Sequence, residues 1–375
     1  MIKNIKFGLY FLGVLSAFLF VIFIADPTLA LEITKENLIG EVKFSTGLKF
    51  ESTEVGGLSG ITYEASKKVY YVISDDRSQK NQARFYTLKI DEDPTQLKPG
   101  KVKFVGVTTL LNEQDQPFPP LSLDPEGIAL MGNSVFIASE GDIERKINPF
   151  IRQFSLTGKL LKTLPIPEKF LPNSQGDVGV RNNLAFESLT VTPDQKYLFT
   201  ATENALIQDG DVPTYKTGTP CRILRYNLAN DRPEKEFVYL TEPLIGEATT
   251  SENFITNGLV DLVAISENHL LSLERGFSIL MGNTIRIFDI DLEKADDIQG
   301  IDSLKGRLSE VSPVQKRLLL DLQEVNLLLD NVEGLALGPR LADGRRLLVL
   351  VSDNNFNPLQ FTQFLEFGIN FSKTP

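Results

Sequence analysis

Five segments of this chain repeat one order of parts, and that repetition constrains the fold more than any other feature of the sequence. Each segment begins with a short strand pattern that carries a small or acidic residue near its start. A turn and a second apolar strand follow, the second strand ends in a polar cluster, and a third strand has aromatic or branched residues. A unit of this kind cannot bury its apolar faces alone, so several must pack against one another. The five segments are 57–90, 124–156, 185–228, 258–292 and 331–367.

The repeats predict an all-β chain folded as a β-propeller, in which short sheets stand radially around a central channel. A fourth strand pattern follows four of the repeats, at 101–111, 159–167, 234–244 and 315–325. The fifth repeat has none, and we expect residues 41–50 to supply it, so that an N-terminal strand closes the ring. Five repeats are visible, and a degenerate sixth within 232–257 or 293–320 would give six blades. The alternative is a large β-sandwich or two separate β domains, which the regular recurrence of the polar cluster disfavours.

The first 30 residues have the pattern of a secretory signal peptide. Lys3 and Lys6 precede an apolar run from Phe7 to Ile24, and Thr28-Leu29-Ala30 places small residues before a cleavage site. An uncleaved membrane anchor is the alternative, since 18 apolar residues almost span a bilayer. The pattern predicts a secreted or periplasmic protein whose mature chain, residues 31–375, is the propeller.

Composition excludes several classes of function. With 38 Lys+Arg against 49 Asp+Glu, the net charge of −11 disfavours binding to a nucleic-acid backbone. One Cys and one His exclude a disulfide framework, multi-Cys metal sites and His-rich zinc sites. We therefore expect a small anionic or ester ligand, no nucleic acid, no membrane contact after signal removal, and a monomer.

Several motifs in order resemble one known family of exported bacterial propellers. They are DPEGIAL, AFESLTVTPDQKYLFTATEN, LLSLERGF and NVEGLALG followed by LLVLVSDNNF. Together they are similar to the phytase-like family, also described as "esterase-like activity of phytase", over about residues 57–367. The resemblance implies a propeller fold and hydrolysis of phosphate or other esters. It brings no established catalytic positions, so the site has to be argued from the residues.

Acidic residues near the start of the first strands are expected to converge at one mouth of the channel. Ca²⁺ takes about six to eight oxygen ligands and needs neither His nor Cys, so we predict a Ca²⁺ site there. The alternative is that these carboxylates accept hydrogen bonds from backbone N–H groups of neighbouring blades and only hold the ring together. Ser59 takes the fifth place in this ring of first strands. The predicted metal ligands are Glu126, Glu187, Asp261 and Glu333, together with Asp353 from the end of a second strand.

The polar clusters that end the second strands are expected to form a rim. Its acidic members are Asp75, Asp76, Glu140, Asp142, Glu203, Glu274 and Asp353. Within the rim, residues without a counterpart in the other repeats are the better candidates for chemistry. Arginines there would hold an anionic group bidentately, and a channel carboxylate would activate water. The predicted catalytic residues are Glu274, Arg275, Asp76 and Arg77.

The leading hypothesis is an exported, metal-dependent phosphoesterase that acts at the channel mouth on a phosphorylated small molecule. A Ca²⁺-dependent esterase or lactonase is the second hypothesis, in which the metal polarises a carbonyl group. The third is a propeller of the cell envelope that binds a ligand or protein without catalysis. The sequence leaves open whether the protein is an enzyme.

Overall fold

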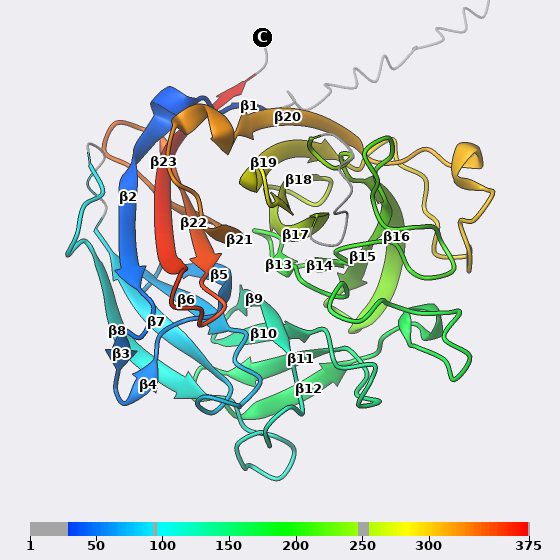
Figure 1. The fold of residues 1–375 in the computed structure, drawn as a ribbon, viewed down its shortest axis with the longest axis horizontal. Coiled ribbons are helices and arrows are strands. Elements are labelled where there is room, and N and C mark those ends of the chain that lie inside the picture. Colours follow the sequence, from blue (N-terminus) through cyan, green and yellow to red (C-terminus); the bar gives the residue numbers. More distant parts are fainter. Residues whose placement is uncertain (1–28, 92, 94–95, 247–254, 374–375) are drawn as a thin grey trace, which may run out of the picture.

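The computed structural model describes residues 29–373 except 92, 94–95 and 247–254, and these residues form a propeller of five blades (Figure 1). The predicted fold class is confirmed. Most of the predicted signal peptide, residues 1–28, lies outside the described part of the chain. Among the described residues, no helix is long and apolar enough to cross a membrane.

Each of the first four blades is an antiparallel sheet of four strands that follow one another in the chain. The fourth strands lie within the four segments predicted for them. Blade 1 is β5 (Leu58–Glu64), β6 (Val69–Ser74), β7 (Arg84–Ile90) and β8 (Val102–Thr109). Blade 2 is β9 (Pro125–Met131), β10 (Ser134–Ser139), β11 (Phe150–Ser155) and β12 (Leu160–Leu164). Blade 3 is β13 (Thr190–Val191), β14 (Tyr197–Ala201), β15 (Pro220–Asn227) and β16 (Arg232–Leu240). Blade 4 is β17 (Thr256–Ala264), β18 (His269–Ser278), β19 (Gly282–Asp291) and β20 (Gln315–Asp321).

Blade 5 combines both ends of the chain, as predicted. It contains β21 (Asn331–Arg340), β22 (Arg346–Asp353) and β23 (Phe361–Lys373), and β2 (Leu38–Ser45) is hydrogen-bonded to β23 as its outer strand. A further short strand, β1 (Leu29–Glu32), pairs with the last residues of β23. Leu29 and Ala30 of the predicted cleavage site therefore belong to β1. The two N-terminal strands lie beside β23 in Figure 1.

The segments considered for a sixth blade belong to blades 3 and 4. Residues 232–257 begin with β16, and residues 293–320 contain a loop and most of β20. Outside the blades, β3 (Lys49–Phe50) and β4 (Thr53–Glu54) form a small hairpin that leads into blade 1. The 3₁₀ helices with described bounds are η1 (Lys35–Asn37), η2 (Glu168–Phe170), η4 (Leu308–Glu310) and η5 (Leu322–Val325).

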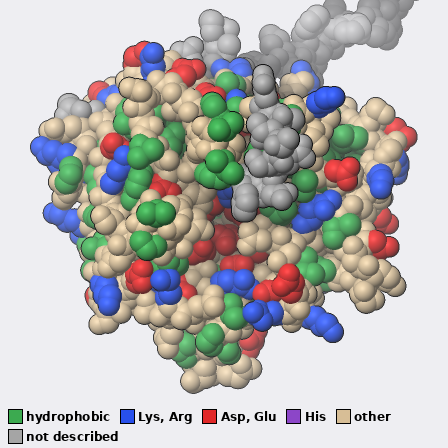
Figure 2. All heavy atoms as spheres, in the orientation of Figure 1, with side chains coloured by type: hydrophobic (Ala, Val, Ile, Leu, Met, Phe, Trp, Pro, Cys, Tyr) green, Lys and Arg blue, Asp and Glu red, His purple; other side chains and the backbone are tan. Residues whose placement is uncertain are grey.

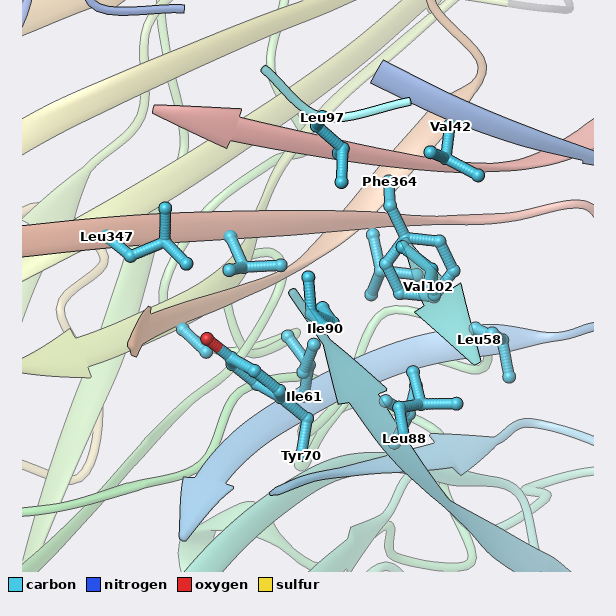
Figure 3. Close-up of a cluster of buried hydrophobic side chains, with 14 of the residues drawn as sticks. Val42, Leu58, Ile61, Tyr70, Leu88, Ile90, Leu97, Val102, Leu347 and Phe364 are labelled. Carbon is cyan, nitrogen blue, oxygen red and sulfur yellow. The ribbon is translucent and has the colours of Figure 1, made fainter. Parts of the chain in front are cut away.

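The core consists of five apolar clusters, one in each seam between neighbouring blades. A middle strand packs on both faces, and successive side chains point to opposite faces. In β22, Val349 enters the seam with blade 1 whereas Leu350 enters the seam with blade 4. This explains why the second strands of the repeats are almost continuously apolar. Figure 3 shows the seam between blades 5 and 1, where Phe364 faces Val102 and Ile90 lies nearby.

Candidate metal centre in the channel mouth

The first two strands of each blade place two residues at one mouth of the channel. The pairing of these strands is interrupted near the start of the first strand, for example between Leu58 and Gly60 in blade 1. One residue is left unpaired there, as in a β-bulge. These bulge positions are Ser59, Glu126, Glu187, Val260 and Glu333. The matching positions on the second strands, which we call strand-end positions, are Asp75, Glu140, Glu203, Arg275 and Asp353.

Blade 4 therefore differs from the others at both positions. Its bulge position holds Val260 and its strand-end position holds Arg275, where the other blades have mostly carboxylates. The sequence had suggested Asp261 as the acidic counterpart in this blade. Because side chains alternate along a strand, a shift of one residue moves Asp261 to the other face.

The carboxylates of the mouth lie close enough together to hold cations. Two groups of three have one carboxylate oxygen each within 4.8 Å of one another, and Glu140 belongs to both. We call them triad 1 (Asp124, Glu126 and Glu140) and triad 2 (Glu140, Glu187 and Glu203). Acidic side chains are visible at the floor of the hollow in the centre of this face (Figure 2).

Local backbone contacts fix the shared ligand. The Glu140 N–H donates to the carbonyl of Asp124 at 3.0 Å, which joins two members of triad 1 at the end of β10. The Glu140 side chain accepts a hydrogen bond from the backbone N–H of Ala185 in blade 3. In blade 1, Gly57 adopts a φ of +62°, and a Cβ there would overlap the Asp75 carboxylate. The chain thus keeps these acids close to backbone and to one another.

Burial and mutual repulsion disfavour the charged forms of these groups. Burial, then the charges of neighbouring carboxylates, raises the pKa of Asp75 to about 8. Burial raises the pKa of Asp124 and of Glu203 to about 7, although an arginine beside each acts in the other direction. The pKa values of Glu126, Glu140, Glu187 and Asp353 are also raised well above normal by burial and by nearby acids.

Two arginines flank the triads. Arg275 lies 2.8 Å from Glu333 and 3.8 Å from Glu203 of triad 2. Burial alone would lower its pKa, but Glu333, Glu203 and Glu187 raise it. Arg77 donates to Asp142 and its Nε lies 3.5 Å from Asp124 of triad 1. The Arg77 side chain is 27% exposed, so it can still contact a molecule that enters the mouth.

The structure separates the four predicted catalytic residues into two groups. It brings Arg77 and Arg275 to the triads, as described above. Glu274 lies instead in the seam with blade 3, where Tyr239 Oη, Asn257 Nδ2 and Lys316 Nζ donate to it. Asp76 is ion-paired with Arg84 at 2.7 Å. Asp76 also accepts three backbone N–H groups of its own loop, those of Gln79, Lys80 and Asn81.

The predicted metal ligands are also divided. Glu126 and Glu187 belong to the triads. Glu333 accepts from Arg275 and from Asn331 Nδ2, and Asp353 feels the charges of Asp75 and Glu333. Asp261 stands apart, since its carboxylate oxygens accept the backbone N–H groups of Leu262 and Leu335. A hydrogen bond from the Leu189 backbone also lowers the pKa of Asp261, which burial otherwise raises, so its carboxylate joins blades 3, 4 and 5.

Replacement of Asp261 by alanine tests this structural role. Each buried N–H group that loses its acceptor costs about 1–3 kcal/mol, so the free energy of unfolding should fall by roughly 3 kcal/mol or more. Ca²⁺ affinity of the folded protein should not change. Urea denaturation and calorimetric Ca²⁺ titration measure the two quantities. A variant with normal stability and weakened Ca²⁺ binding would return Asp261 to the metal ligands.

Sequence reasoning missed Asp124 and underrated Glu140 and Glu203. Asp124 precedes the acid of the DPEG motif by two residues, so it seemed a turn residue rather than a ligand. Glu140 and Glu203 were assigned to a rim that need not lie at the same mouth as the bulge positions. Their equivalent places at the ends of β10 and β14 were the available signal.

The residues present fit a hard divalent cation. The triads supply oxygen atoms alone, which suits Ca²⁺ or Mg²⁺ rather than soft metals. Of the buried polar atoms in the described mouth, Asp75 Oδ1 has no hydrogen-bond partner. A cation would offset the repulsion that raises the pKa values of these acids.

Fold and site together define a five-bladed propeller with an acidic channel mouth that is suited to bind cations. A family model described as "Phytase-like: Esterase-like activity of phytase" matches residues 53–356, so the chain belongs to the phytase-like family. An "Uncharacterized secreted protein" of Arthroderma benhamiae is 26% identical over 143 residues, which cover 32% of this chain and 27% of that protein. The aligned part is thus about a quarter of the length of that relative.

Solved propellers resemble the chain at low sequence identity. The "Structure of Dos1 propeller" has 8% identity and a TM-score of 0.35, with 84% of this chain and 69% of that chain covered. The "Structure of U3-55K" has 11% identity and a TM-score of 0.37, with 87% and 98% covered.

Proposed function

We propose that the protein is an exported, Ca²⁺-dependent hydrolase that acts on phosphate esters of small molecules in the channel mouth. The observation that carries the proposal is the pair of carboxylate triads that share Glu140, with Arg77 beside one triad and Arg275 beside the other. Membership of the phytase-like family and the secreted relative support the same proposal.

The triads would hold the cation, and the arginines would hold the anionic end of the substrate. Ca²⁺ at Asp124, Glu126, Glu140, Glu187 and Glu203 would supply Lewis-acid polarisation of the ester and neutralise the acidic mouth. Arg77 and Arg275 present guanidinium groups, which match phosphate geometry. Arg77 is the more accessible of the two, so we assign to it the first contact with the substrate.

Hydrolysis assays on the calcium-free mature chain, residues 31–375, test the proposal. We expect no turnover of p-nitrophenyl phosphate without metal and a saturable recovery as Ca²⁺ is added back. Recovery of p-nitrophenyl acetate turnover alone would instead establish the esterase hypothesis. If Ca²⁺ binds but neither ester is hydrolysed, the protein is a binding propeller of the envelope.

The expected partner of the site is a small anionic molecule, and the protein is expected to act as a monomer outside the cytoplasm. Export is supported by the N-terminal pattern Lys3 to Ala30 and by the description of the relative. N-terminal sequencing of protein recovered from the medium or periplasm of an expressing bacterium tests this. A mature end at Leu31 is expected, and a chain retained in the membrane with Met1 would favour the anchor.

A further inference from the structure

Glu366 is a buried carboxyl group without a partner, far along the chain from the channel mouth residues. It lies on β23, where it pairs with Gly40 of β2 and Val349 of β22. The residue is 0% exposed, and neither of its carboxylate oxygens has a hydrogen bond. A buried carboxyl group without a partner is costly, so this position calls for an explanation.

The surroundings of Glu366 are the apolar seam between blades 5 and 1. Phe364, two residues earlier on the same face of β23, packs in this seam with Val42, Leu97 and Val102. Figure 3 shows Leu97 and Val42 on either side of the strand that carries Phe364. The seam clusters therefore explain the neighbours of Glu366 but not the carboxyl group itself.

The loop after β7 brings two further acids to Glu366. Leu97 of this loop forms a bridge with Gly40, the strand partner of Glu366, and its N–H donates to Ile39 at 3.3 Å. The contact is close, since a Cβ on Gly40 would lie 2.5 Å from the Leu97 carbonyl oxygen. Asp91 and Asp93 stand at the start of the same loop. Burial, followed by the charges of these two acids, raises the pKa of Glu366 to about 8.

Lys101 supplies the positive charge among these three acids. Its Nζ lies 2.5 Å from Asp91 and 3.8 Å from Asp93. It makes no hydrogen bond to Glu366, whose oxygens are both unpaired. Three ionised carboxylates and one ammonium leave a charge of −2, which one divalent cation would balance.

The geometry points to a second divalent cation site, formed by Glu366, Asp91 and Asp93 in the seam between blades 5 and 1. Ca²⁺ suits it, because all the ligand atoms are carboxylate oxygens and Glu366 has both of its own available. The Lys101 ammonium and the cation compete for the same acids. Bound Ca²⁺ would join the N-terminal strand β2, the C-terminal strand β23 and the first blade, and so stabilise the closure of the ring. This site is independent of the hydrolase proposed for the channel.

Equilibrium dialysis of the mature chain against ⁴⁵Ca²⁺, with Glu366→Gln as the variant, tests the inference. The variant should bind one equivalent of Ca²⁺ less than the parent, while the remaining affinity stays the same. Glutamine keeps the shape of the uncharged acid, so we expect the metal-free variant to fold and to melt no lower than the parent. Glu64→Gln is the matched control, because Glu64 is also a buried carboxylate but accepts from Tyr71 Oη and Ser66 Oγ. That control should retain the full stoichiometry.

Lys101→Met gives a second, independent readout. Without the competing ammonium, the affinity of this site for Ca²⁺ should rise by about 10-fold, and the Ca²⁺-dependent gain in melting temperature should grow. Unchanged stoichiometry in Glu366→Gln would overturn the inference. Equal or weaker Ca²⁺ binding in Lys101→Met would do so too, because Lys101 would then be the permanent counter-charge. If the channel binds no metal, the parent still binds one equivalent and Glu366→Gln binds none.

Discussion

Exchange of Glu140 for glutamine is expected to lower Ca²⁺ affinity in the channel by at least about 100-fold, since loss of even an outer partner of a metal ligand costs about 10–100-fold. Phosphate-ester hydrolysis should fall below detection. The reason is geometric, because Glu140 is the residue common to both triads. A neutral amide there removes a ligand charge from both places at once. Isothermal titration with Ca²⁺ and turnover of p-nitrophenyl phosphate measure the two effects.

Comparison with single-triad variants sharpens this test. Asp124→Asn changes triad 1 alone and Glu203→Gln changes triad 2 alone, so each should cost less affinity than the Glu140 variant. Glu64→Gln serves as the control for replacing a buried carboxylate, and its binding and turnover should match the parent. A Glu140 variant with unchanged Ca²⁺ affinity would show that the triads are scaffold. Hydrolysis that survives without Ca²⁺ would remove the metal from the proposed reaction.

The blade architecture could be predicted from the sequence because each repeat carries its own local signals. Alternation, turns and apolar second strands recur five times, so errors at one repeat are corrected by the others. The closure by β2 followed from the missing fourth strand of the last repeat. The predicted segment 41–50 is displaced by a few residues from the observed Leu38–Ser45, since strand ends depend on partners that the sequence does not show.

The site was less predictable because it depends on register rather than on residue type. Asp261 and Glu274 were chosen as the acidic residues of blade 4, yet both lie one residue away from the positions that face the channel mouth. An interruption of one residue in the pairing decides this, and nothing in the local composition marks it. Arg77 and Arg275 were found for a better reason. They interrupt repeated acidic clusters, and a cation among many carboxylates has few other places to be.

The calcium-free protein is expected to lose stability as pH rises from 5 to 8. Burial first, and neighbouring carboxylates second, raise the pKa of Asp75 from 3.8 to about 8. A group whose pKa is raised on folding favours the folded state below its unfolded pKa, and this contribution is lost as pH rises through the folded pKa. With about 1.4 kcal/mol for each pKa unit, a shift of this size in one group gives a loss of roughly 5 kcal/mol, or on the order of 10 °C in Tm.

Bound Ca²⁺ should remove most of this slope, because the metal stabilises the ionised carboxylates in the folded state. Thermal unfolding at pH 5, 6, 7 and 8, with metal-stripped protein and again with excess Ca²⁺, measures both curves. Glu366 contributes with the same sign, since burial also raises its pKa to about 8. The comparison is therefore repeated with Glu366→Gln, in which the remaining slope belongs to the channel. A Tm that stays level or rises between pH 5 and 8 without metal would mean that the arginines already neutralise the mouth. Cation binding would then be unnecessary for its stability.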